Sequence, residues 1–287
     1  MVEKCYIPSS LEEALKIRRE TGARPLAGGS DLMVQYKQGI GITPAFPFPV
    51  MIISKLEELR GIRQKDDGSV EIMALATPDE IAHCPFMPWH VKNAASRMGA
   101  IALRNTATIG GNIGNASPKG DLPQPLILLD AEIVLRNCDE ERIMPLDEFI
   151  LGSKKTALRD DEIIYKIIIP PVSYSYAYYR KIGTRKANAI SKLSLSSLIT
   201  IEEGVITDFR AASGAAGPKV IRSRESENIL KGKRIEEVED VLPSFLDSWN
   251  DAISPHAMPQ YRRNTTRRML EHFVLTAAGM PENQIIE

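Results

Sequence analysis

Cysteine and histidine are scarce in this chain, and their positions exclude several kinds of site. The three cysteines, Cys5, Cys84 and Cys138, form no CxxC pair, and the four histidines show no metal-ligand spacing. A disulfide framework, a structural zinc site or an iron–sulfur cluster would need closely spaced ligands of these types. We therefore expect this chain to bind no metal.

The chain also lacks an excess of charge and a long apolar segment. Lysine and arginine number 36 and aspartate and glutamate 37, which gives a net charge of -1. Proteins that bind a nucleic-acid backbone usually carry a clear basic excess. The first residues contain no apolar signal segment, and no apolar run reaches the length of a membrane span. We expect a cytoplasmic protein with no nucleic-acid partner and no membrane span.

Two short loops with paired glycines are the most informative features that are present. The first is RPLAGGSDL, residues 24–32, and the second lies within TATIGGNIGNASPKGD, residues 106–121. Paired glycines let the main chain approach a ligand closely, and consecutive N–H groups in such a turn can bind an anion. Either loop could equally be no more than a tight turn.

The surroundings of both loops favour a phosphate ligand that carries a sugar. The residues with suitable chemistry are Gly28, Gly29, Ser30 and Asp31 in the first loop, and Gly110, Gly111 and Asn112 in the second. The first group lies between a predicted strand and a predicted helix start, which suits a pyrophosphate. Asp121 would repel a phosphate but could accept hydrogen bonds from sugar hydroxyls. Neither loop has the spacing of a Rossmann fingerprint.

Secondary-structure signals in the first 170 residues alternate between helix and strand. A capping box at Ser9 or Ser10 begins a helix that ends at Gly22, and Thr77 followed by proline begins another. Segments 24–26, 50–53, 70–74 and 163–169 predict strands, and segments 30–37 and 89–98 predict helices. Apolar segments surround a turn at Asp130, and a hairpin follows through residues 137–142.

The pattern changes after Pro170 and Pro171, which we interpret as a linker between domains of residues 1–171 and 172–287. Segments 174–181, 190–201 and 205–212 predict a meander of antiparallel strands. Segments 225–230, 235–252 and 261–278 predict helices. The chain is therefore expected to be α+β, with a sheet backed by helices in its last third.

Three segments together resemble a known family. AGGSDL, RNTATIGGNIGNASPKGDLPQPLILLDAEI and EIIYKIIIP are similar to the FAD-binding (medium) subunit of the molybdenum hydroxylases, the family of xanthine, carbon monoxide and nicotinate dehydrogenases. The late segment ISPHAMPQYRRNTTRRML is similar to the C-terminal helix of that family. The resemblance implies a two-subdomain FAD-binding domain of the vanillyl-alcohol-oxidase/MurB-like (PCMH) type, divided at about residues 1–55 and 56–171. It also implies a C-terminal α+β domain near the flavin.

The resemblance assigns roles to particular residues. The segment that would wrap the FAD pyrophosphate is Arg24, Pro25, Leu26, Ala27, Gly28, Gly29, Ser30, Asp31 and Leu32. The segment that would run toward the isoalloxazine is Thr108, Ile109, Gly110, Gly111 and Asn112. Asp121 corresponds to an acid that binds the ribose, and Ile164 to an aliphatic residue packed on the flavin ring. FAD is expected to be bound non-covalently, because no histidine follows the first glycines.

Lys181 corresponds to a lysine near the flavin ring, where its charge would stabilise the anionic reduced flavin. We therefore expect Lys181 to be the catalytic residue of this chain, although a solvated lysine at a strand end is an equal alternative. Arg185 is expected to be structural or to lie at a subunit contact. The chain departs from the usual pattern at Ala102, Asn188 and Ser191, so the electron acceptor stays open.

The resemblance implies an electron-transfer subunit. Its FAD, expected to be its only redox centre, would take electrons from [2Fe-2S] clusters of a small partner subunit and pass them to NAD+ or another acceptor. A large partner subunit would carry molybdopterin and hydroxylate the organic substrate, in an assembly expected to be a dimer of heterotrimers. Two alternatives are a self-contained FAD-dependent oxidoreductase of the same superfamily and a scaffold that has lost FAD.

Overall fold

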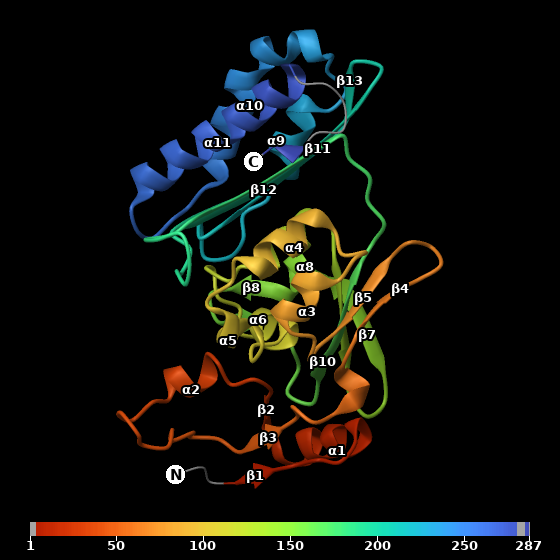
Figure 1. Cartoon of the computed structure of the whole chain (residues 1–287), viewed down its shortest axis with the longest axis vertical. Coiled ribbons are helices and arrows are strands. Elements are labelled where there is room, and N and C mark those ends of the chain that lie inside the picture. The colour runs from red at the N-terminus through yellow and green to blue at the C-terminus, as the bar shows by residue number, and fades with distance from the viewer. Residues whose placement is uncertain (1–3, 280–284, 287) are drawn as a thin grey trace.

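The chain is arranged in three parts that follow one another along its longest axis (Figure 1). The computed structural model describes residues 4–279 and 285–286. Each part has its own sheet, and we refer to them as the N-terminal, middle and C-terminal parts. The N-terminal sheet is parallel, whereas the middle sheet is antiparallel throughout.

The N-terminal part is a small parallel sheet of order β1-β3-β2 with one long helix. Its elements are β1 (Cys5–Tyr6), α1 (Leu11–Thr21), β2 (Arg24–Leu26), α2 (Leu32–Gln35) and β3 (Val50–Ile52). As predicted, α1 has a side-chain cap at Ser10, which accepts from the N–H of Glu13, and it ends at Gly22 with φ 64°. The helix predicted over 30–37 is shorter, and it begins directly after the first glycine loop.

The middle part contains a five-stranded sheet of order β4-β5-β10-β6-β7. Its strands are β4 (Ile62–Gln64), β5 (Val70–Met73), β6 (Glu132–Arg136), β7 (Glu141–Pro145) and β10 (Ile163–Ile169), with a small hairpin of β8 (Ile150–Gly152) and β9 (Lys155–Thr156). Its helices are η1 (Glu57–Leu59), α3 (Pro78–His83), α4 (Trp89–Ser96), α5 (Ile101–Arg104), α6 (Ile109–Gly114), α7 (Pro123–Leu128) and α8 (Leu146–Phe149). The second glycine segment, expected to be a loop, is therefore the short helix α6.

The C-terminal part confirms the predicted meander. Its sheet has the order β13-β12-β11-β14, from β11 (Tyr176–Ile182), β12 (Leu193–Glu202), β13 (Val205–Gly214) and β14 (Ile285–Ile286). The helical elements are α9 (Arg224–Leu230), η2 (Ile235–Glu237), α10 (Val238–Ala252) and α11 (Pro259–Gly279). In Figure 1 α10 and α11 cover the sheet face that is turned away from the middle part. The other face packs on α4 and α7.

The packing of the core fixes the C-terminal sheet to the middle part. Tyr179 and Leu198, on β11 and β12, belong to the same buried cluster as Ile109 and Ile72 of the middle part. At this contact the ring of His90 is fully buried, and its Nε2 donates to the carbonyl oxygen of Ser197 at 2.9 Å. Residues of the C-terminal part are thus held in defined positions next to the glycine segments.

Candidate functional site

The first glycine loop follows β2 and touches the chain just before the second glycine segment. A Cβ atom on Gly28 would lie 1.7 Å from the carbonyl oxygen of Thr106, so only glycine fits there. Gly29 has φ +66°, a left-handed conformation that glycine adopts without strain. Among the described residues, none accepts a hydrogen bond from the N–H groups of Gly28, Gly29 or Ser30. These three donors are therefore available to a ligand.

The second glycine segment behaves differently, because the protein itself uses its N–H groups. The N–H groups of Ile109 and Gly110 donate to the carbonyl oxygens of Ala76 and Ala74, both at 2.9 Å. Thr108 caps α6 by accepting from the N–H of Gly111 at 3.1 Å. The interpretation of this segment as a second anion turn built from free N–H groups was therefore wrong. Gly110 is needed for packing, since a Cβ there would lie 2.9 Å from atoms of Ala74.

The side chain of Asn112 is the polar group that this segment leaves without a partner. Its Oδ1 atom is buried and accepts no hydrogen bond from any described residue. A buried carbonyl oxygen without a donor costs free energy, and such groups in folded proteins usually meet a ligand or an ordered water. Asn112 therefore adds a side-chain acceptor to the site, where the sequence suggested backbone donors.

Four polar side chains join the two glycine segments to each other. Gln35 donates to Asp31 and, at 3.1 Å, to Oδ1 of Asn115 at the end of α6. Lys154, in the turn between β8 and β9, donates to the same Asn115 and to Asp31 at 3.4 Å. Sequence reasoning missed Lys154, since its turn is remote from both segments in the chain and has no motif of its own.

Asp121 and Lys181 meet directly across the contact between the middle and C-terminal parts. The Nζ atom of Lys181 lies 2.7 Å from Oδ2 of Asp121, and the hydroxyl of Ser191 donates to Oδ1 at 2.8 Å. Lys181 also donates to the carbonyl oxygen of Arg97 at 3.1 Å. Burial raises the pKa of Asp121, whereas the charge and hydrogen bond of Lys181 act in the opposite direction. Lys181 is therefore a paired lysine whose side chain is only 8% exposed.

Tyr179 lies on the same face of β11 as Lys181. Its hydroxyl is buried without a partner among the described residues, and the guanidinium of Arg97 lies 5.6 Å from its ring centroid. Burial raises the pKa of Tyr179, and the nearby charge of Asp121 adds to the effect. The phenol therefore stays neutral and can donate a hydrogen bond.

The remaining predicted site residues are in or beside the same region. Ile164, at the bulge of β10, is 8% exposed, and its Cδ1 would lie 3.1 Å from a Cβ placed on Gly114 of α6. Pro25 and Leu26 pair with β3, and the guanidinium of Arg24 lies 4.0 Å from the ring centroid of Phe48.

The described residues contain no group of three or more His, Cys, Asp or Glu that could hold a metal ion. They likewise include no helix with the length and apolar character needed to cross a membrane.

Comparison with known proteins identifies the class. Residues 1–172 match the family model of the FAD binding domain in molybdopterin dehydrogenase, and residues 177–277 match the CO dehydrogenase flavoprotein C-terminal domain. The chain therefore belongs to the family of FAD-binding subunits of the molybdenum hydroxylases, as its resemblance implied, and its cofactor is FAD. The predicted α+β fold of the PCMH type is confirmed as well.

The relatives are similar to this chain over most of their length. The nicotinate dehydrogenase FAD-subunit of Eubacterium barkeri is 30% identical over 275 residues, which are 91% of each chain. The carbon monoxide dehydrogenase medium chain of Hydrogenophaga pseudoflava is 27% identical, over 79% of each chain. In the solved structure of carbon monoxide dehydrogenase from that organism, one chain superposes with a TM-score of 0.86 at 22% identity, covering 97% of this chain and 98% of that one. This similarity shows the fold.

The residues present fit the cofactor. The first loop offers three N–H donors where any side chain on Gly28 would collide with the main chain, and Asn112 offers a buried oxygen that lacks a donor. The carboxylate of Asp121, which follows α6 in the chain, retains unused lone pairs, because each of its oxygens accepts one hydrogen bond from the protein. Groups whose chemistry suits a phosphate and a sugar hydroxyl are therefore present.

Proposed function

We propose that this chain is the electron-transfer subunit of a molybdenum-containing hydroxylase or dehydrogenase. The observation that carries the proposal is that a FAD-binding domain and a CO dehydrogenase flavoprotein C-terminal domain follow each other in one chain. Relatives with this arrangement are FAD subunits and medium chains of dehydrogenases. Electrons enter from the [2Fe-2S] clusters of a small partner subunit and leave to NAD+ or another acceptor. Molybdopterin and substrate hydroxylation belong to a large partner subunit.

The pyrophosphate of FAD is held by the first glycine segment, Arg24 to Leu32. Support comes from the free N–H groups of Gly28, Gly29 and Ser30, which lie before the start of α2. Asp31 does not bind the pyrophosphate with its side chain, because Gln35 and Lys154 both donate hydrogen bonds to its carboxylate. Its role is to fix the loop against α6.

The second segment, Thr108 to Asn112, contributes close main-chain packing at Gly110 and the side chain of Asn112. Gly110 lets α6 lie against β5, and the Oδ1 atom of Asn112 accepts a hydrogen bond from the cofactor. Asp121 accepts from the ribose hydroxyls through lone pairs that Lys181 and Ser191 leave free. Ile164 presents an aliphatic surface beside Gly114, which suits contact with a ring.

Lys181 is the residue that acts on the reactive part of the cofactor. Bound FAD supplies the chemistry of one- and two-electron transfer. An ammonium group has three donors, of which Lys181 uses two on Asp121 and Arg97, so one remains for a flavin heteroatom. Its positive charge favours the anionic reduced state, and Asp121 keeps the ammonium in place.

Reconstitution tests the proposal. The purified chain is expected to be yellow, to release FAD on heating and to be inert toward purines and aldehydes. Adding its molybdenum and iron–sulfur partner subunits is expected to restore substrate-dependent reduction of the flavin. Turnover of an organic substrate by the isolated chain would instead identify a self-contained oxidoreductase. A chain that takes up no FAD would contradict any electron-transfer role.

We further propose that the chain divides into domains of residues 1–171 and 172–287, with the first split near residue 55, and that it works in the cytoplasm. The separate buried clusters around Met51, Ile72 and Phe209 support the division. Limited proteolysis with mass spectrometry tests it, since early cleavage is expected in the exposed linker around Pro171.

A further inference from the structure

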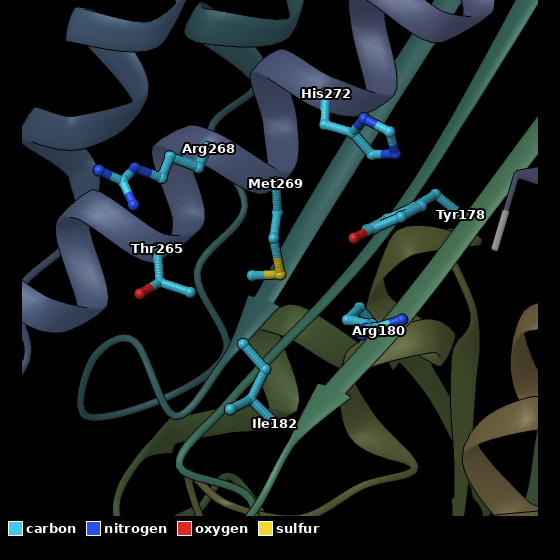
Figure 2. Close-up of a pocket in the computed structure, with 7 residues that line it drawn as sticks. All are labelled: Tyr178, Arg180, Ile182, Thr265, Arg268, Met269 and His272. Atoms are coloured by element: carbon cyan, nitrogen blue, oxygen red, sulfur yellow. The ribbon is translucent and has the colours of Figure 1, made fainter.

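A groove of about 480 Å³ lies on the outer side of the C-terminal part, between β11 and α11 (Figure 2). Side chains of a strand alternate between its two faces. Tyr179 and Lys181 of β11 point toward Arg97 and Asp121, so Tyr178 and Arg180 point to the face that α11 covers. The groove is therefore separate from the FAD site, and none of the residues assigned to that site lines it.

The rim of the groove is cationic, and none of the described residues that line it carries a negative charge. Arg180 on β11 and Arg268 on α11 are both exposed, and neither forms an ion pair or hydrogen bond with any described residue. His272 and Thr265 add further polar groups, and no lining residue carries a carboxylate. Most other arginines of the C-terminal part are paired, as Arg267 is with Asp247. Two free guanidinium groups at one groove therefore indicate an anionic ligand.

The floor of the groove is apolar. It consists of the ring of Tyr178, the side chain of Ile182 and the thioether of Met269, and Met269 lies between the two arginines in Figure 2. Arg268 projects from the helix side and Arg180 from the strand side, so the two charges do not converge on one point. This arrangement suits an elongated ligand with apolar and acidic groups better than a single phosphate. Tyr, Met and Arg are also the residue types enriched where proteins bind each other.

The edge of β11 supports the same kind of ligand. The short strand β14 pairs with it in parallel at Ala177 and Tyr178. From Tyr179 to Ile182, no described strand pairs with this edge. An exposed strand edge binds extended peptides through main-chain hydrogen bonds, while side-chain pockets set the specificity. The unpaired stretch runs along the groove, beside Arg180.

We propose that this groove docks an extended acidic segment of a partner subunit, which pairs with the free edge of β11 and places carboxylates on Arg180 and Arg268. The proposal rests on the proposed function, because it assumes that the chain works in a complex. The acidic chemistry of the segment follows from charge complementarity, and its extended form follows from the part of the β11 edge that no described strand covers.

The test is co-purification of the FAD-loaded chain with its molybdenum and iron–sulfur subunits, followed by titration at two salt concentrations. The charge reversal Arg180→Glu with Arg268→Glu is expected to weaken assembly by about tenfold or more, because two attractions become repulsions. The wild-type affinity is expected to fall with salt and that of the variant to rise, because salt screens attraction and repulsion alike. The matched control is Arg63→Glu with Lys65→Glu, two exposed cations of the middle part, which is expected to assemble normally.

Unchanged FAD content and thermal unfolding will show that the variants fold. Normal assembly of the double variant would overturn the groove proposal alone, as would an equal loss in the control. Arginine-dependent binding of inorganic phosphate with normal assembly would identify a small-anion site and also overturn it. The groove proposal would also be overturned if the chain associates with itself through the two arginines and still assembles normally with its partner subunits. Failure of the wild-type chain to assemble with either subunit would overturn both this inference and the proposed function.

Discussion

Lys181 of the C-terminal sheet and Asp121 of the middle part form an ion pair of 2.7 Å, so two residues proposed for the cofactor site join these parts of the chain directly. The pair is almost enclosed, with side-chain exposures of 8% and 10%. Breaking an enclosed pair by removing one partner is costly, because the other charge stays buried.

Lys181→Met is therefore expected to destabilise the apoprotein by about 3 kcal/mol at pH 8. Adding Asp121→Asn is expected to restore part of the loss, which urea unfolding in a double-mutant cycle will measure. Burial already raises the pKa of Asp121, and loss of the lysine raises it further. The variant is therefore expected to recover stability as the pH falls and the carboxylate takes up a proton. Additive effects of the two substitutions would contradict a coupled pair.

Gly28→Ala is expected to abolish FAD retention and to destabilise the chain by about 2 kcal/mol or more. The added methyl group would lie 1.7 Å from the carbonyl oxygen of Thr106, so the two glycine segments must separate. Gly152→Ala is the control, because a Cβ there meets no atom within 4 Å and φ is not positive. Flavin absorbance per protein and thermal unfolding measure both effects, and full FAD occupancy of Gly28→Ala would refute the predicted contact.

His90 is expected to make the stability of the chain depend on pH. Burial lowers the pKa of His90 from 6.5 to about 4, so the unfolded chain binds more protons than the folded chain between these values. The contribution of His90 to the free energy of unfolding is therefore at its full value above pH 6.5. It falls by about 3 kcal/mol as the pH drops to 4.

Urea unfolding at several pH values measures this slope. His90→Gln is expected to remove most of it, whereas the same change at the exposed His256 is expected to leave it intact. Equal slopes in the wild type and in His90→Gln would show that other groups cause the dependence.

Lys154→Met is expected to weaken FAD binding by about two- to fivefold, the size expected for an exposed ion pair. The lysine contacts Asp31 after the first glycines and Asn115 at the end of α6, so its loss relaxes the geometry of both glycine segments. The neighbouring Lys155 is exposed and makes no such contact, which makes Lys155→Met a matched control. Fluorescence titration of the apoproteins with FAD compares them, and identical affinities would remove Lys154 from the site.

Local signals predicted those parts of the fold that local chemistry determines. The cap at Ser10, the stop at Gly22 and the antiparallel meander all follow from patterns within a few residues. Helix α6 could not be predicted in this way, since the sequence IGGNIG has a low helix propensity and the helix depends on hydrogen bonds from Ile109 and Gly110 to the residues that follow β5. Tertiary contacts overrode propensity there.

Among the candidate site residues, too, the sequence could not predict the contacts between distant parts of the chain. The family resemblance selected Asp121 and Lys181 separately, yet nothing in the sequence revealed that they bond to each other across the two parts. Lys154 was missed for a related reason, because its contact with Asp31 joins positions 123 residues apart. Pairings of this kind depend on the assembled fold, and a single sequence contains no local trace of them.

The steric requirement at Gly28 and Gly110 has an evolutionary consequence. Both glycines are required by the approach of one protein segment to another, at Thr106 and Ala74, whether or not a cofactor is bound. A descendant that had lost its flavin would still be under selection to keep them. Gly28 and Gly110 therefore record ancestry and folding, and a loss at Asn112, whose Oδ1 atom has no partner among the described residues, would be the earlier sign that a lineage had abandoned redox chemistry.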